Sequence, residues 1–240
     1  MTDKHSHQEF DQFASAYTDI LAPSLALSGY GTNYFDEYKI KVVYSHIIKS
    51  GNSKVPRSFL NFGCGVGRSE KIISQYFPNC AIYSTDISSE SIRIAKEYNS
   101  LLDNVTFAVS EGIAIPFDRT FDIIFCAGVF HHIPCEERLP ILAELKSKLS
   151  PDGVLFIFEH NPWNPITRRI VATCPLDDNA HLIGPVAMGR MLRQSGFTSI
   201  VRNFIVFFPR WLEFLSPLEK MMGHCPLGAQ YVMMASTHSL

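Results

Sequence analysis

Residues 58–68 read Ser-Phe-Leu-Asn-Phe-Gly-Cys-Gly-Val-Gly-Arg. A short apolar run breaks into three glycines at alternate positions, Gly63, Gly65 and Gly67, and a helix-like pattern follows. Glycine permits positive φ angles, and it lacks the Cβ that would collide with a ligand close to the backbone. The stretch therefore predicts a buried strand, a sharp loop that can hold a ligand, and then a helix.

Apolar runs and amphipathic stretches alternate along the chain after this loop. Strands that are continuous apolar runs, separated by amphipathic helices, are typical of a parallel sheet covered by helices on both faces. We therefore expect an α/β fold. A Pro-Asp-Gly sequence at 151–153 predicts a tight turn between a helix and a strand. The predicted strands are 58–62, 81–85, 105–109, 121–127, 154–159, 199–208 and 229–236, of which the last two could pair antiparallel, and the predicted helices are 68–77, 88–98, 136–149 and 185–195.

Two segments do not follow this alternation of predicted strands and helices. Residues 9–50 carry two apolar stripes at helical spacing and predict an N-terminal helical cap. Residues 160–183 contain three prolines, a tryptophan and a basic pair, and they are too long for an ordinary connection. We interpret them as a lid or substrate segment. The organisation expected for 1–240 is a single domain.

The composition limits the class of protein and its partners. The chain has 240 residues, 46% hydrophobic and 18% charged, which is ordinary for a globular domain. Its formal net charge is −2, so no basic surface suggests nucleic acid as a partner. Six scattered cysteines without a C-x-x-C pair argue against a structural zinc site and against a disulfide scaffold. With neither a secretory signal nor a membrane-spanning stretch, we expect a cytoplasmic protein without stable membrane insertion.

The residues that could bind a ligand or take part in a reaction follow the predicted strands at their carboxyl ends, where α/β sheets bind ligands. Asp86 ends the second strand, roughly 20 positions after the glycine loop, where a carboxylate can reach ribose hydroxyls. A nicotinamide enzyme would also place a glycine loop here, but its pattern is G-x-G-x-x-G/A. This chain has Arg68 at the third small position and reads G-x-G-x-G instead. The loop therefore favours a different nucleoside cofactor.

Several stretches together resemble the class I S-adenosylmethionine-dependent methyltransferases. They are the loop 59–67, Asp86, the acid-containing stretch 110–117, the strand 121–125 with 129–133, and the turn 149–155. Residues 10–17 are similar to the N-terminal helix of the small-molecule branch, which includes ubiquinone, menaquinone and sugar-pathway enzymes. The resemblance implies a Rossmann-like, seven-stranded, mostly parallel sheet with helices on both faces, N-terminal helices and a small lid. It also implies S-adenosylmethionine as cofactor and S-adenosylhomocysteine as product.

The resemblance assigns cofactor-binding roles to a set of residues in this chain. They form three groups. The first would contact the methionine part, the second the ribose and adenine, and the third would lie beside the sulfonium. Asn61 departs from the family, because an acid is usual at that position. The residues assigned are Gly63, Cys64, Gly65 and Gly67 for the methionine part, with Tyr17 or Lys39 over its carboxylate; Asp86 for the ribose; Ile87, Glu111, Gly112 and Ile113 for adenine; and Ala127 and Gly128 beside the sulfonium.

The acceptor determines whether a base is needed, because a hydroxyl must lose a proton and a free amine need not. Of the four candidates, His131, His132, His160 and His181, we expect His132 to be the base, since it follows the fourth strand beside the expected sulfonium. We expect no metal: His132 and Glu136 have helical i, i+4 spacing but no apparent third ligand.

The expected function is methyl transfer to a small-molecule acceptor by a monomer or homodimer. The acceptor group could be a hydroxyl or an amine of a sugar or glycan pathway, because residues 158–165 and 174–177 resemble uncharacterised bacterial methyltransferases associated with such pathways. Two other functions stay open at this point. One is an NAD(P)-binding oxidoreductase, and the other is a non-catalytic S-adenosylmethionine-binding protein.

Overall fold

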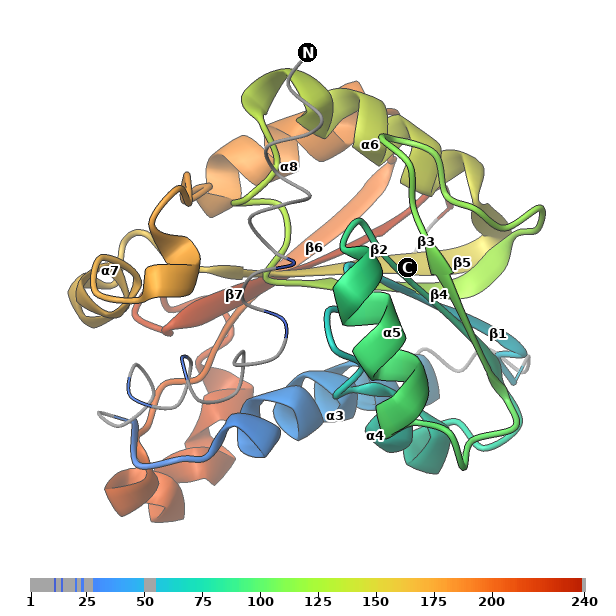
Figure 1. The fold of residues 1–240 in the computed structure, drawn as a ribbon. Helices are drawn as coiled ribbons and strands as arrows, with labels where there is room; N and C mark the ends of the chain where they lie inside the picture. The colour runs from blue at the N-terminus through green and yellow to red at the C-terminus, as the bar shows by residue number, and fades with distance from the viewer. Residues whose placement is uncertain are drawn as a thin grey trace.

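A seven-stranded sheet runs through the molecule, in the order β3-β2-β1-β4-β5-β7-β6 (Figure 1). The computed structural model describes residues 11, 14, 20, 23, 28–49 and 55–238. Strands β1 to β5 pair in parallel, while β7 is antiparallel to both β5 and β6. This confirms the predicted α/β fold with a mostly parallel sheet and an antiparallel pair at its end. The strands are β1 Ser58–Phe62, β2 Ala81–Asp86, β3 Val105–Val109, β4 Phe121–Ala127, β5 Leu149–His160, β6 Ser199–Ile205 and β7 Gln230–Ser236.

Helices cover both faces of the sheet. In Figure 1, α6 and α8 lie above it and α3, α4 and α5 lie below it. Side chains of a strand alternate between the two faces, so Leu60 and Phe62 belong to the apolar core with Leu142 of α6 and Leu192 of α8. Phe59 points the other way, into the core with α3 and α4. The helices are α3 Thr32–Lys49, α4 Glu70–Tyr76, α5 Ser89–Tyr98, α6 Cys135–Ser147, α7 Pro165–Val171 and α8 Pro185–Gln194, with 3-10 helices η3 Pro175–Asp177 and η4 Arg210–Met221.

The predicted turn at 151–153 is wrong. Helix α6 ends at Ser147, and residues Leu149–His160 form one long strand. Phe121 pairs with Leu149, but Ile123 pairs with Val154, so β5 holds three more residues than β4 between these pairs. These extra residues bulge without ending the strand. A Cβ on Gly153 would lie 2.8 Å from the carbonyl oxygen of Phe121, so the bulge brings the two backbones close together.

Strand β6 is shorter than predicted, because it ends at Ile205 and not at residue 208. Val206 has a φ of +61°, which takes the backbone out of the extended conformation. Helix α3 agrees with the second helix expected within 9–50. The first apolar stripe of that segment, with Phe10, Phe13 and Tyr17, lies outside the described residues. No described helix has both the length and the apolar character that are needed to cross a membrane.

Candidate active site

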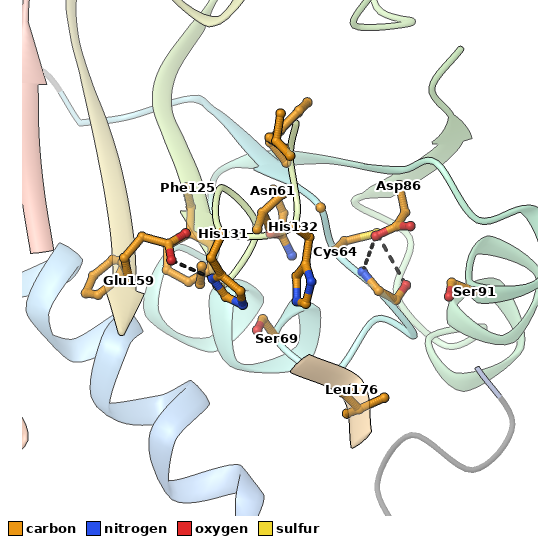
Figure 2. A pocket seen from close by; sticks show the side chains of 18 of the residues that line it. Asn61, Cys64, Ser69, Asp86, Ser91, Phe125, His131, His132, Glu159 and Leu176 are labelled. Carbon is orange, nitrogen blue, oxygen red and sulfur yellow. Dashed lines mark hydrogen bonds and ion pairs between the residues drawn. The ribbon is translucent and has the colours of Figure 1, made fainter. Parts of the chain in front are cut away.

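A cavity of about 300 Å³ opens at the carboxyl ends of the central strands (Figure 2). This is the position at which open α/β sheets bind their ligands. Ten of the residues that the sequence assigned to the cofactor or to the catalytic base line it. Gly67 does not line it, and neither do Glu111 and Ile113, whose side chains are exposed; Tyr17 lies outside the described residues. The ten are Lys39, Gly63, Cys64, Gly65, Asp86, Ile87, Gly112, Ala127, Gly128 and His132.

The three glycines of the loop have different surroundings. All have positive φ angles, +73° for Gly63, +52° for Gly65 and +73° for Gly67. A Cβ on Gly63 would lie 2.4 Å from Cγ2 of Val129, and a Cβ on Gly67 would lie 2.7 Å from the Cβ of Ala95. Among the described residues, no atom lies within 4 Å of a Cβ built on Gly65. Two glycines therefore let the loop pack against its neighbours, and Gly65 alone leaves open space beside the cavity.

Asp86 holds the glycine loop as well as lining the cavity. Its Oδ2 accepts a hydrogen bond from the backbone N–H of Gly65 at 2.8 Å, and its Oδ1 accepts one from the backbone N–H of Ser88 at 3.0 Å. Burial raises the pKa of Asp86, and these backbone donors oppose that shift. The Asp86 carboxylate thus fixes the position of Gly65 relative to β2.

A buried glutamate lies behind the asparagine that departs from the family pattern. The amide nitrogen of Asn61 donates to Oε1 of Glu70 at 2.8 Å, and the hydroxyl of Ser84 donates to the same oxygen at 2.8 Å. All three side chains are buried. An acid is therefore present next to β1, but it is Glu70 of α4 and not a residue of the strand itself. Sequence reasoning missed this residue, because nothing in the pattern Arg-Ser-Glu pairs a helix residue with Asn61.

The titration of Glu70 gives a prediction for stability. Burial raises the pKa of Glu70, so the folded chain holds a proton where the unfolded chain has lost it. The stabilisation is complete below the unfolded pKa of about 4.3 and declines as the pH rises through the higher folded pKa. A Glu70→Gln variant cannot titrate at this position. Its free energy of unfolding should therefore rise relative to wild type between about pH 4 and pH 7, measured by urea denaturation; parallel pH profiles would contradict the prediction.

The cavity is closed on one side by residues from the N-terminal part of the chain. Arg68 forms an ion pair with Asp36 of α3 at 2.5 Å, so the residue that breaks the dinucleotide pattern joins the loop to this helix. Lys39 of α3 lines the cavity, and burial lowers its pKa. Asp11 accepts hydrogen bonds from the Ser88 hydroxyl and the Glu90 N–H at the start of α5.

A cluster of three histidines and two acids lies at the carboxyl ends of β4 and β5. Nδ1 of His131 lies 2.6 Å from Oε2 of Glu159, and Figure 2 shows these side chains pointing toward each other, with His132 beside them. Oδ1 of Asp177 lies 3.4 Å from Nε2 of His131 and 3.5 Å from Nε2 of His132. The ring of His160 is centred 5.2 Å from that of His131. Strands β4 and β5 and the segment 160–183 meet in this cluster.

The three histidines of the cluster have different pKa values. Burial lowers the pKa of His131, but the Glu159 and Asp177 carboxylates outweigh it and raise that pKa to about 9. Burial, together with the positive charge of His131, lowers the pKa of His132 and of His160 to about 4. At neutral pH, His131 therefore carries a proton and the other two rings do not.

The sequence predicted the positions of these histidines but not their partners. His132 was expected at the cavity, and the structure places it there. Its predicted neighbour Glu136 lies in the first turn of α6 with an exposed side chain. Glu159 was noted only as a strand end, and Asp177 only within a resemblance. Glu159 lies near the end of β5 and Asp177 at the end of η3. A carboxylate at such an end, close to the end of β4, is the signal that would have found both.

Comparisons with known proteins agree with this geometry. A family model described as a methyltransferase domain matches residues 59–153. A trans-aconitate 2-methyltransferase of Methylobacterium radiotolerans is 26% identical over 153 residues, which are 62% of this chain and 57% of that protein. A malonyl-[acyl-carrier protein] O-methyltransferase of Halalkalibacterium halodurans is 28% identical over 111 residues, 45% of this chain and 40% of that protein. The chain thus spans about half the length of these curated relatives.

A solved structure shows the same fold over nearly the whole chain. The magnesium protoporphyrin IX methyltransferase of Synechocystis PCC 6803, with bound S-adenosylhomocysteine, has a TM-score of 0.62 at 19% identity. The match covers 94% of this chain and 96% of that chain. The glycine loop, Asp86 and the histidines after β4 all lie within the matched family segment. Residues 59–153 therefore match a methyltransferase domain, and the chain around them has the fold of a solved methyltransferase structure.

Proposed function

We propose that this protein transfers a methyl group from S-adenosylmethionine to an oxygen atom of a small-molecule acceptor. The observation that carries the proposal is the pairing of Gly65 with Asp86. The loop glycine leaves open space where a Cβ would stand, and the Asp86 carboxylate beside it is fixed by two backbone N–H groups. A loop of this form fits a nucleoside with a charged amino-acid tail.

The residues that would hold the cofactor are those predicted from the family and found around the cavity. Gly63, Cys64 and Gly65 would lie along its methionine part, with Lys39 of α3 opposite them. Asp86 would accept hydrogen bonds from the ribose hydroxyls. Ile87 would pack on adenine, Glu111 would accept a hydrogen bond from its amino group, and the backbone of Gly112 and Ile113 would hold the ring. Gly67, Glu111 and Ile113 do not line the cavity and Tyr17 lies outside the described residues, so their roles rest on the family resemblance alone. We also propose that Asp11 and Ala14 belong to a cap over this end of the cavity, because Ala14 lines it.

S-adenosylmethionine, when bound, supplies an electrophilic methyl group on a sulfonium. The chain has to exclude water and align the acceptor with that methyl group. Ala127 and Gly128 border the cavity after β4 and would lie beside the sulfonium, where small residues leave room for an acceptor. Cys174, Leu176 and Asp177 line the cavity from the segment 160–183, which we propose is the lid that covers the acceptor.

An oxygen acceptor is favoured by the names of the relatives. The malonyl-[acyl-carrier protein] enzyme is an O-methyltransferase, and a ubiquinone biosynthesis O-methyltransferase of Haemophilus ducreyi is 24% identical over 130 residues. A sugar or glycan-pathway hydroxyl has the same chemistry and remains our proposal for the acceptor. His132 borders the cavity, as Gly128 does, and would take the hydroxyl proton.

Calorimetry with S-adenosylhomocysteine and with NAD tests the cofactor. We expect S-adenosylhomocysteine to bind and NAD not to bind, because Arg68 occupies the position of the third small residue of the dinucleotide loop. Binding of NAD alone would replace the proposal with an oxidoreductase. Binding of S-adenosylhomocysteine without methyl transfer in a screen of hydroxyl acceptors would support a non-catalytic binding protein.

Replacing His132 tests its role as the base. A His132→Ala variant should lower kcat by about 100-fold or more, because general-base catalysis contributes 10²–10⁴-fold. Its affinity for S-adenosylhomocysteine should stay within about two-fold of wild type, since His132 is not among the residues assigned to the cofactor. Turnover is measured with labelled S-adenosylmethionine and affinity by calorimetry. Normal turnover of the variant would remove His132 from the mechanism.

A further inference from the structure

We propose that His131, His160 and Asp177 form a binding site for a divalent transition-metal ion of the zinc class, on the acceptor side of the cavity. One donor atom from each of these residues lies within 4.8 Å of the others. All three residues line the cavity. This site was not expected from the sequence, where His132 and Glu136 were the only pair considered. It stands on the geometry of the cluster and is independent of the proposed methyl transfer.

The distances suit a shared ion. Two ligands on one tetrahedral zinc lie about 3.3 Å apart, given metal–ligand bonds of about 2.0–2.1 Å. Nε2 of His131 and Oδ1 of Asp177 already lie 3.4 Å apart. The donor of His160 is within 4.8 Å of both, so a movement of the His160 ring of roughly 1–1.5 Å would complete the set.

His131 is oriented as metal-binding histidines are. Such histidines usually donate the ring N–H that does not bind the metal to a carboxylate, which fixes the ring and its tautomer. Glu159 occupies that place, with Oε2 at 2.6 Å from Nδ1 of His131 and Oε1 accepting the backbone N–H of Phe130 at 2.8 Å. The His131 side chain is 1% exposed. Its Nε2 is buried and makes no hydrogen bond within the described part of the chain, and it points toward Asp177.

The charge and the chemistry of the donors favour a zinc-class ion. Two carboxylates, Glu159 and Asp177, lie within or beside the cluster. A divalent cation would displace the second ring proton that His131 carries in the metal-free chain and would balance both carboxylates in its place. Two imidazoles and one carboxylate suit zinc and its neighbours better than magnesium or calcium, which prefer oxygen ligands. Three protein ligands leave a position open on a tetrahedral ion, as in catalytic zinc sites. All three ligands line the cavity, so water or an oxygen of an acceptor could take that position.

Zinc binding to the full-length chain is the direct test. The chain is stripped with a chelator, dialysed, and titrated with Zn²⁺ by calorimetry, and with Co²⁺ to observe the ligand-field bands of a four- or five-coordinate ion. We expect one ion per chain, bound with a Kd below about 1 μM. His160→Ala and Asp177→Asn should each weaken Zn²⁺ binding by about 100-fold, and Glu159→Gln by about 10–100-fold, because Glu159 orients His131 and does not touch the ion.

Two matched control variants test whether histidines outside the proposed site bind the metal. His181→Ala changes an exposed histidine of the same segment and should bind Zn²⁺ as wild type does. The double variant His5→Ala/His7→Ala tests the N-terminal histidines, which lie outside the described residues, and should also bind normally. Circular dichroism and the thermal midpoint of each stripped variant show whether it is folded. A rise in the midpoint of wild type on addition of Zn²⁺ gives a readout that needs no variant.

The outcomes separate this proposal from the proposed function. Failure of wild type to bind Zn²⁺ or Co²⁺ would overturn the metal site, as would loss of binding in His5→Ala/His7→Ala with retention in His160→Ala. Calorimetry with S-adenosylhomocysteine on the stripped and the Zn²⁺-loaded chain is run in parallel. Binding of the cofactor product without binding of metal leaves methyl transfer standing, and binding of metal alone leaves the metal site standing.

Discussion

Replacing Gly63 by alanine is expected to lower the free energy of unfolding by about 3 kcal/mol, whereas Gly65→Ala should lower it by about 1 kcal/mol. Both positions have positive φ angles, so both variants carry backbone strain. Only at Gly63 does the new Cβ also meet a neighbour, Cγ2 of Val129 at 2.4 Å. Urea denaturation of the two variants against wild type measures the difference.

A double variant tests the cause of this difference. Gly63→Ala/Val129→Ala removes the side chain that the new Cβ would meet, so it should recover part of the stability lost in Gly63→Ala. Gly65→Ala should fold but bind S-adenosylhomocysteine more weakly, because its Cβ enters the open space that we assign to the cofactor. Equal stability of the two single variants would contradict the packing account. Full affinity in Gly65→Ala would contradict the placement of the cofactor.

Replacing Asp86 by alanine is expected to weaken S-adenosylhomocysteine binding by about 100-fold. A hydrogen bond to a charged group contributes about 1.5–3 kcal/mol, and the variant would lose those proposed to the ribose. It would also release the Gly65 N–H that Asp86 holds at 2.8 Å. Asp86→Asn keeps one acceptor oxygen and should lose less affinity than Asp86→Ala. Calorimetry gives both affinities, and circular dichroism confirms that the variants are folded.

The control for this prediction is Asp103→Ala. Asp103 is an exposed acid in the turn after α5 and does not line the cavity. Its replacement changes the net charge by the same amount as Asp86→Ala, so it isolates the effect of position. We expect wild-type affinity for S-adenosylhomocysteine in Asp103→Ala. Wild-type affinity in Asp86→Ala as well would remove Asp86 from the cofactor site.

Local patterns were sufficient to predict the elements of the central sheet. The apolar run 58–62 coincides with β1, and 105–109 and 121–127 coincide with β3 and β4. β1 and β4 lie inside the parallel sheet and are almost fully buried, so their sequences are largely apolar without strict alternation. The predictions at 151–153 and at 206–208 failed, because a bulge against β4 and a positive φ at Val206 depend on neighbours and backbone geometry that residue type does not reveal.

The glycine loop shows which features a sequence motif can predict and which it cannot. Its position after β1 and its distance from Asp86 could be read from the residues alone. The different surroundings of Gly63, Gly65 and Gly67 could not, because Val129 and Ala95 come from other parts of the chain. The same holds for Asn61: the sequence showed a missing acid, and only the structure shows Glu70 beside it.

The α/β class, the glycine loop and the family resemblance could be predicted from the residues alone, because they depend on hydrophobic period and on residues close together in the chain. Which side chains meet in the histidine cluster of the cavity depends on the tertiary structure. His131 and Glu159 are 28 positions apart, and Asp177 belongs to the segment after β5. Parallel strands end at the same edge of the sheet, so distant residues converge there. Periodicity and spacing cannot show which of their atoms come within 4 Å of one another.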